Sequence, residues 1–149
     1  MRIAVLNGPN LNLLGIREPE IYGRATLAEV ENNLSAVGRE LGVSIECSQN
    51  NSEGALIDVV HSLRGRAHGA IVNAGAYSHT SLALRDAFVA VGLPFVEVHV
   101  TNVYAREAER RHSMLASSAV GVVIGLGTMG YELALRGLVA TLRAQGVTA

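Results

Sequence analysis

Short runs of Val, Ile and other apolar residues alternate with helix-like stretches along the whole chain. Strands that are separated by helices pair in parallel, through right-handed crossovers. The pattern therefore predicts an α/β fold, with a flavodoxin-like, five-stranded parallel sheet and helices on both faces. The expected strands lie at residues 2–6, 43–48, 69–73, 95–99 and 119–124.

Capping signals mark the stretches between the runs. Thr26-Leu-Ala-Glu29 has the spacing of a capping box, and Gly42 is placed to end the helix that it opens. Further helices fit residues 54–65, 80–91 and 129–144. Because the chain contains no linker, repeat or low-complexity segment, residues 1–149 are expected to form a single domain.

Composition excludes several classes of protein. A net charge of −1 gives no electrostatic attraction to nucleic acid or to anionic membranes. All twelve basic residues are arginine, and the absence of lysine excludes Schiff-base catalysis, lysine-anchored pyridoxal phosphate and a Walker-type phosphate loop. The single cysteine, Cys47, cannot form an internal disulfide or a zinc cage, and it is interpreted as an inert core residue.

The amino terminus becomes polar too soon for a signal peptide. The longest apolar run, Ala119 to Leu126, is much shorter than the roughly 20 residues that span a bilayer. A soluble protein of a reducing compartment, with a cytoplasmic location, is expected.

The connection between the first strand and Thr26 is unusually long for a compact domain. It contains apolar residues that would be costly to leave in water (Leu11, Leu13, Leu14, Ile16 and Ile21), so an ordered loop over a site is expected. The loop carries Arg17 and Tyr22. A tyrosine acts as a base at neutral pH only when its pKa is lowered, which a guanidinium can do. The alternative is that Tyr22 packs the loop onto the domain.

Polar residues follow the first, third and fourth expected strands. In open α/β sheets, ligands bind outside the carboxyl ends of the strands. The fold therefore predicts a site at this edge of the sheet. Its candidates are Asn7, Asn10, the segment Asn73 to His79, Glu97, His99 and Thr101.

Glu97 and His99 lie two residues apart on one strand and so share a face. A carboxylate beside an imidazole fixes the tautomer and favours the protonated form that a general acid needs. A structural histidine is the alternative, and a metal site with His79 and His112 is a third interpretation that their spacing disfavours. Asn73 either caps a loop or points at a ligand.

Two other patterns have ordinary explanations. Gly125-Leu-Gly127-Thr-Met-Gly130 matches a dinucleotide fingerprint but lacks the acidic partner further on, so a tight turn with close helix–sheet packing is the better interpretation. The arginines at 106, 110 and 111 fit a solvated helical face.

Several motifs occur together in one order over nearly the whole chain. They are Asn7-Gly-Pro-Asn-Leu-Asn-Leu-Leu-Gly15, Arg17-Glu-Pro-Glu-Ile-Tyr-Gly23, Asn73-Ala-Gly-Ala-Tyr-Ser-His-Thr-Ser81, Ala83-Leu-Arg-Asp86, Val96-Glu-Val-His99 and Arg110-Arg-His-Ser113. With these motifs the chain resembles the type II 3-dehydroquinate dehydratases. The resemblance implies anti elimination of water from 3-dehydroquinate, giving 3-dehydroshikimate through an enolate, with no cofactor and no metal.

The resemblance also assigns catalytic roles. Tyr22 would remove the proton α to the ketone, with Arg17 lowering its pKa. The enolate would be stabilised by hydrogen bonding that involves Asn10, through water. His99 would protonate the leaving hydroxyl while Glu97 holds its ring.

Substrate binding is implied in the same way. The side chains of Asn73, His79 and Arg110 would hold the ring carboxylate and hydroxyls, and the backbone amides of Val100 and Thr101 would complete the cradle. Family members assemble as dodecamers of four trimers, in which Asp86 would reach a neighbouring subunit's site. The implied pathway is the shikimate route to chorismate and the aromatic amino acids.

Four positions depart from the family pattern, namely Thr101, Tyr104, Met114 and Ser118. They leave open a paralogue with altered kinetics or a role in quinate breakdown.

Three other functions compete with the lyase. They are a flavodoxin-like module that binds a nucleotide or flavin, a catalytically inactive scaffold, and a metallohydrolase.

Overall fold

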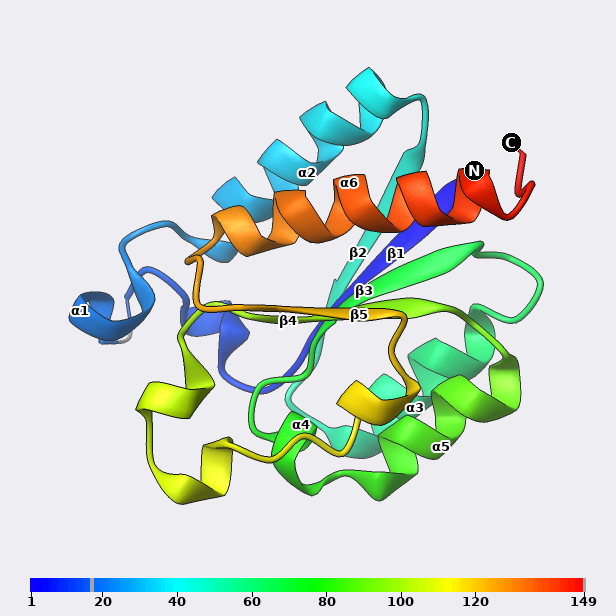
Figure 1. Cartoon of the computed structure of the whole chain (residues 1–149). Helices are drawn as coiled ribbons and strands as arrows, with labels where there is room; N and C mark the ends of the chain where they lie inside the picture. The colour runs from blue at the N-terminus through cyan, green and yellow to red at the C-terminus, as the bar shows by residue number, and fades with distance from the viewer. Residues whose placement is uncertain (17, 149) are drawn as a thin grey trace.

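The computed structural model describes residues 1–16 and 18–148, with only the backbone of Pro19 and Tyr22. Five parallel strands form one sheet in the order β2-β1-β3-β4-β5 (Figure 1). This flavodoxin-like order confirms the predicted fold class. The strands are β1 (Arg2–Asn7), β2 (Ser44–Gln49), β3 (Gly69–Asn73), β4 (Phe95–His99) and β5 (Gly121–Ile124).

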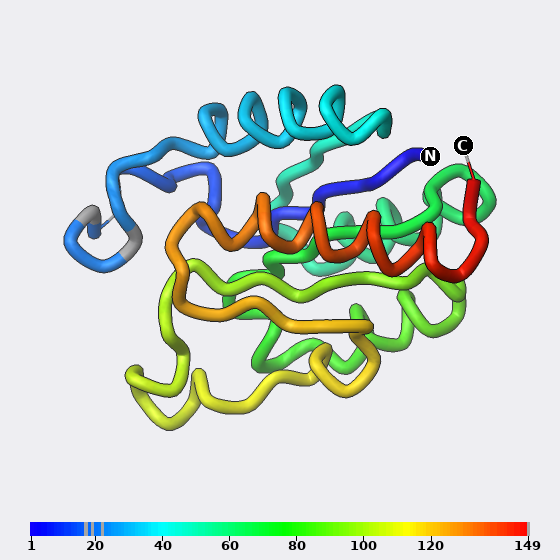
Figure 2. Tube along the Cα trace, turned by 45° about the horizontal axis from the view of Figure 1, so that its top comes forward, coloured from blue at the N-terminus to red at the C-terminus, as the bar shows by residue number. Residues whose placement is uncertain are grey.

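Two pairs of helices cover the two faces of the sheet. The helices α2 (Leu27–Leu41) and α6 (Met129–Ala144) lie on one face, and α3 (Glu53–Ser62) and α5 (Leu82–Val91) lie on the other (Figures 1 and 2). The amino terminus and the end of α6 lie together, away from the carboxyl ends of the strands (Figure 2). In the described part of the chain, no helix is long and apolar enough to cross a membrane.

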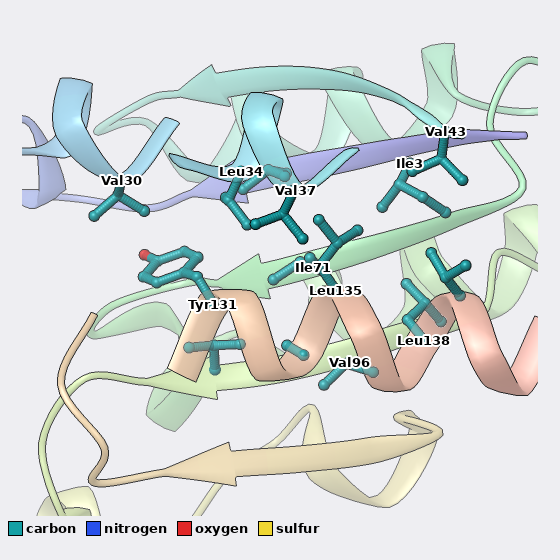
Figure 3. Packing of buried hydrophobic residues seen from close by; sticks show 14 of the residues in the cluster. Ile3, Val30, Leu34, Val37, Val43, Ile71, Val96, Tyr131, Leu135 and Leu138 are labelled. Atoms are coloured by element: carbon teal, nitrogen blue, oxygen red, sulfur yellow. The ribbon is translucent and has the colours of Figure 1, made fainter. Parts of the chain in front are cut away.

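The core has two halves because successive strand residues point to opposite faces. Ile3 and Val5 of β1 pack beneath α2 and α6, whereas Ala4 and Leu6 pack beneath α3 and α5. Figure 3 shows side chains of the first half, with Leu34 and Val37 of α2 facing Leu135 of α6. Full burial of one such side chain contributes about 1.5–3 kcal/mol.

The predicted capping signals of α2 are confirmed. The Thr26 hydroxyl accepts from the backbone N–H of Glu29 at 3.2 Å, and the Glu29 carboxylate accepts from the backbone N–H of Thr26 at 2.7 Å. The Thr26 hydroxyl also donates to this carboxylate at 2.9 Å, and the backbone and hydroxyl donors of Thr26 together lower the pKa of Glu29. Gly42 ends the helix with a φ of 67°, in the left-handed region that glycine adopts at little cost.

Some predicted boundaries are wrong by a few residues. The second helix begins at Glu53 and ends at Ser62, because the Ser52 hydroxyl caps it through Ala55. The third begins at Leu82 behind Ser81, and it is preceded by a separate turn, α4 (Tyr77–Thr80). The fifth strand begins at Gly121, since a 3-10 turn, η4 (Ala116–Ser118), occupies the residues just before it.

In its described residues, the long connection after β1 contains η1 (Leu11–Leu13) and α1 (Pro19–Tyr22). Leu14 is buried, but Ile16 is 73% exposed, and Leu13 and Ile21 are also exposed. The expectation that the loop's apolar side chains are withdrawn from water is therefore wrong for these three in the single chain. Figure 1 shows α1 outside the two helical layers.

Candidate active site

A pocket with a volume of about 150 Å³ lies at the carboxyl ends of β1, β3 and β4. This is the edge at which the fold was expected to place a site. The loop after β1, the turn after β3 and the segment after β4 all contribute to it. Its lining comprises Pro9, Asn10, Leu11, Leu13, Leu14, Asn73, Gly75, Ala76, His79, His99, Val100, Thr101, Val103, Arg106 and Arg110.

Close backbone packing brings the loop after β1 against the end of β3. The Gly8 N–H donates to the Asn73 carbonyl at 2.8 Å, and a Cβ at position 8 would lie only 2.3 Å from the Ala74 carbonyl oxygen. Only glycine fits this approach. Asn10 then adopts a left-handed conformation, with φ at 67°, and its N–H donates to Asn51 Oδ1 at 3.0 Å. The loop is thereby held across the mouth of the sheet.

A buried tyrosine joins the asparagines that end β1 and β3. The register places Asn7 opposite Asn73. Tyr131 Oη donates to Asn7 Oδ1 at 2.6 Å and accepts from Asn73 Nδ2 at 2.8 Å, while Asn73 Oδ1 accepts from the Gly75 N–H at 3.2 Å. Burial raises the pKa of Tyr131 strongly, against the opposing effect of the Asn73 hydrogen bond. The phenol thus stays neutral and holds Asn73 in one orientation at the pocket wall.

The Glu97–His99 pair has the geometry that was predicted from its spacing. Glu97 is completely buried, and its Oε1 lies 2.8 Å from His99 Nε2. The His99 ring stacks on that of His79 with the centroids 5.8 Å apart. His79 Nδ1 lies 2.8 Å from the His112 carbonyl oxygen, which can only accept, so Nδ1 carries the proton. Both imidazoles are therefore oriented by fixed partners, and both line the pocket.

The glycine turn after β5 supports the segment that follows β4. The N–H groups of Gly125 and Gly127 donate to the carbonyls of His99 and Val100, each at 3.0 Å. Both glycines have positive φ, and a Cβ on Gly130 would lie 3.4 Å from Val123. The interpretation of this motif as a tight turn with close helix–sheet packing is confirmed.

Arg110 lies in η3 (Ala108–Arg110), a 3-10 turn rather than the helical face considered for the arginines. Its Nε donates to Glu107 Oε1 at 2.5 Å, and this guanidinium lowers the pKa of Glu107 to about 2. The ion pair fixes the guanidinium of Arg110 at the pocket wall.

Comparison with known proteins identifies the family. The sequence model described as Dehydroquinase class II matches residues 1–139. The chain belongs to the class II dehydroquinase family. It is 62% identical over 142 residues to the 3-dehydroquinate dehydratase of Gemmatimonas aurantiaca, covering 95% of this chain and 93% of that one. It is 54% identical to the catabolic 3-dehydroquinase 2 of Aspergillus flavus over 134 residues, covering 90% and 89%.

Solved structures agree with this assignment. Type II dehydroquinase from Propionibacterium acnes superposes with a TM-score of 0.89 at 42% identity, covering 93% of this chain and 96% of that one. The type II dehydroquinase from Butyrivibrio crossotus gives a TM-score of 0.90 at 39% identity, covering 93% and 97%. The fold is thus that of type II dehydroquinases.

The pocket brings together most of the residues expected at the site. Glu97 lies directly behind the lining. Asp86 does not line the pocket, and on the exposed side of α5 it pairs with Arg85 at 3.0 Å. The expected residues in the lining are Asn10, Asn73, His79, His99, Val100, Thr101 and Arg110.

The expected base, Tyr22, and the arginine expected to activate it, Arg17, lie in the loop after β1. Arg17 lies outside the described residues, and so does the side chain of Tyr22. The backbone of Tyr22 ends α1, and its neighbours Ile21 and Gly23 line a second hollow that shares Val100 and Thr101 with the pocket. The roles of Arg17 and Tyr22 remain predictions.

Sequence reasoning assigned no role to two residues that contact the site. Ser113 donates to the Glu97 carboxylate, and Tyr131 binds Asn73. Ser113 stands in one of the family motifs, three residues after Arg110, which was the available signal. For Tyr131 the only available signal in the sequence was its position directly after Gly130.

Neither a metal site nor a reactive thiol is found among the other candidate positions in the described residues. The described residues include no cluster of three or more His, Cys, Asp and Glu side chains that could hold a metal ion. Burial raises the pKa of Cys47 to about 12, with the Glu31 carboxylate adding to the effect. The thiol is therefore protonated and unreactive at neutral pH.

Proposed function

We propose that the chain is a hydro-lyase that removes water from 3-dehydroquinate to give 3-dehydroshikimate. One observation carries this proposal most directly. The pocket at the carboxyl edge of the sheet presents His99, held by a buried carboxylate, among the polar side chains that the dehydroquinase motifs contain. The names of the relatives, 3-dehydroquinate dehydratase and type II dehydroquinase, support the same reaction.

The mechanism starts with removal of a proton α to the ketone. Tyr22, as phenolate, takes this proton, and the cationic Arg17 stabilises the phenolate. The electron pair of the broken C–H bond moves onto the carbonyl oxygen as an enolate. A water held by Asn10 donates to that oxygen, where negative charge develops.

The second step expels the β-hydroxyl. The enolate re-forms the ketone, the new C=C bond forms, and the C–O bond breaks. Since Nε2 of His99 faces Glu97, the other ring nitrogen, Nδ1, is the one that gives its proton to the departing oxygen. Water leaves, and a proton returns from Tyr22 to His99 through solvent before the next turnover. Anti elimination requires Tyr22 and His99 to act from opposite faces of the ring.

Substrate binding uses the remaining lining residues. Asn73, His79 and Arg110, which line the pocket, bind the ring's carboxylate and hydroxyls, and the backbone amides of Val100 and Thr101 complete the cradle. No residue is left to form an imine, because the chain contains no lysine. Activation of the ketone therefore proceeds through the enolate.

We also propose that the protein assembles as a dodecamer of four trimers, with Asp86 reaching a neighbouring site. Exposed apolar side chains on the loop after β1, on α5, on the turn after β5 and on α6 support burial against other copies; they include Ile16, Val89, Leu126 and Met129. Light scattering should give about twelve times the 15.7 kDa chain mass. A monomer of undiminished activity would contradict this assembly.

The reaction belongs to the shikimate pathway, which leads to chorismate and the aromatic amino acids. We place the enzyme in the cytoplasm and assign the whole of residues 1–149 to one catalytic domain. The relatives include an enzyme named catabolic, so a quinate-degrading role is the second candidate. Loss of aromatic prototrophy on deletion of the gene would favour biosynthesis, and loss of growth on quinate would favour catabolism.

The direct test is to add 3-dehydroquinate to the purified, chelator-treated protein and follow the conjugated enone absorbance of the product. We expect turnover that persists when borohydride is added with the substrate. Loss of turnover with borohydride would indicate an imine, and loss on chelation would indicate a metal. A folded protein that forms no enone would contradict the proposed function.

A further inference from the structure

Glu97 is a fully buried carboxylate, and a buried charge is costly unless its partners satisfy it. His99 Nε2 lies 2.8 Å from Oε1. The hydroxyl of Ser113 lies 2.7 Å from Oε1 and 2.9 Å from Oε2. Glu97 therefore sits between the imidazole that faces the pocket and a serine behind it.

The backbone around Ser113 fixes the direction of its hydroxyl. Ser113 Oγ accepts from the N–H of Leu115 at 3.0 Å and from the N–H of Ala116 at 3.1 Å. A hydroxyl oxygen has two acceptor lone pairs and one hydrogen to donate. Both lone pairs are occupied, so the hydroxyl can only donate to Glu97, and this favours the ionised carboxylate.

An ionised Glu97 determines which ring nitrogen of His99 faces the pocket with a transferable proton. The carboxylate accepts from Nε2–H, so Nε2 keeps its hydrogen in every protonation state of the ring. The remaining nitrogen, Nδ1, is then the only one that can carry a transferable proton. A protonated Glu97 could instead donate to Nε2 and reverse this arrangement.

The turn that carries Ser113 is anchored on both sides of the serine. The His112 carbonyl accepts from His79 Nδ1 at 2.8 Å, and the Met114 N–H donates to the Ser78 carbonyl at 2.7 Å. The backbone at Ser113 therefore cannot shift away from Glu97 without breaking these two hydrogen bonds.

We propose that Ser113 is a positioning residue for the dehydration: it keeps Glu97 ionised and aimed at Nε2, so that His99 delivers the proton on Nδ1 to the leaving hydroxyl. The role rests on the proposed function, in which His99 is the acid. Ser113 does not line the pocket and acts only through Glu97.

The test compares Ser113→Ala with Ser117→Ala, an exposed serine in the next turn. Ser113→Ala should lower kcat by about 10- to 100-fold, part of the roughly 10²–10⁴-fold that a general acid supplies. KM should change less than about threefold, because no binding group is lost. Ser113→Thr, which restores a hydroxyl, should recover most of kcat, and Ser117→Ala should behave as wild type.

The pH profile separates positioning from a merely structural role. Without the serine the carboxylate is more basic and holds the imidazolium proton more tightly, so the alkaline limb of kcat should move to higher pH. Reduced thermal stability with an unmoved limb and full kcat would overturn the proposal. If Ser113→Ala does not fold, Ser113→Cys supplies a weaker donor of similar size, and full kcat in that variant would overturn it as well.

Wild-type protein serves as the control for the underlying function. Folded wild type without dehydratase activity would overturn the proposed function, and this role of Ser113 with it. Active wild type beside an equally active Ser113→Ala would overturn the role of Ser113 alone.

Discussion

Tyr131 connects two buried asparagines through a single hydroxyl, and removing it tests how much this connection stabilises the fold. Tyr131→Phe leaves Asn7 Oδ1 and Asn73 Nδ2 without their partner. Each buried polar group left unpaired costs about 1–3 kcal/mol, so the variant should lose at least about 2 kcal/mol. For a chain of this length each kcal/mol lowers Tm by about 2–4 °C, which gives a decrease of about 4–8 °C or more.

Urea unfolding monitored by circular dichroism measures this loss, with Tyr77→Phe as the matched control. The Tyr77 hydroxyl also makes one 2.8 Å hydrogen bond, to the Asn51 carbonyl, but in an exposed position where water can replace it. We expect the control to lose less than about 1 kcal/mol. Because Asn73 lines the pocket, Tyr131→Phe should also raise KM.

A double variant tests the connection itself. Among the described residues, the buried Asn7 Nδ2 has no hydrogen-bond partner, so Asn7→Leu removes one unsatisfied group while orphaning the Tyr131 hydroxyl. Combined with Tyr131→Phe, the two losses should be less than additive, because only Asn73 is then left unpaired. Additive losses, or a Tyr131→Phe variant as stable as Tyr77→Phe, would refute the reasoning.

Three further predictions concern the loop, the glycine turn and the buried thiol. Arg17→Ala should move the acid limb of the kcat–pH profile to higher pH, because the phenolate loses its cation; an unmoved limb would assign that effect to another group. Gly125→Ala should be more destabilising than Gly127→Ala in urea unfolding, because both have positive φ but only at Gly125 would a Cβ meet Asn102, at 3.1 Å. Equal losses of unfolding free energy in the two variants would contradict this, because they would show that Asn102 moves away from the new Cβ without cost. The thiol of Cys47 has its pKa raised to about 12 in the fold, whereas in the unfolded chain it ionises near pH 8.5. Its contribution to stability is therefore complete below about pH 8.5 and decreases as pH rises toward 12, relative to Cys47→Ala; parallel pH profiles for the two proteins would contradict it.

Much of the fold could be predicted because its signals are local. The Val- and Ile-rich runs identify all five strands, and the capping box at Thr26 with Gly42 bounds α2. The site's location also followed, since parallel strands bring their carboxyl ends to one edge. The spacing of Glu97 and His99 on one strand was enough to predict their contact.

The rest depends on contacts between distant parts of the chain. Ser113 lies 16 residues from Glu97, and Tyr131 lies 124 residues from Asn7, so no local pattern relates them. The exposure of Ile16 was missed for a related reason, because the apolar character of a loop does not say which surface covers it. Only the assembled fold reveals these relationships.

The central claim is that a tyrosine phenolate removes the proton in a reaction that His99 completes. Its most direct test is to measure kcat and calorimetric substrate affinity for Tyr22→Phe beside wild type. The account predicts near-normal binding with kcat lowered by about 10²–10⁴-fold, since only the proton-accepting oxygen is lost. A Tyr22→Phe variant that turns over 3-dehydroquinate at the wild-type rate would contradict it.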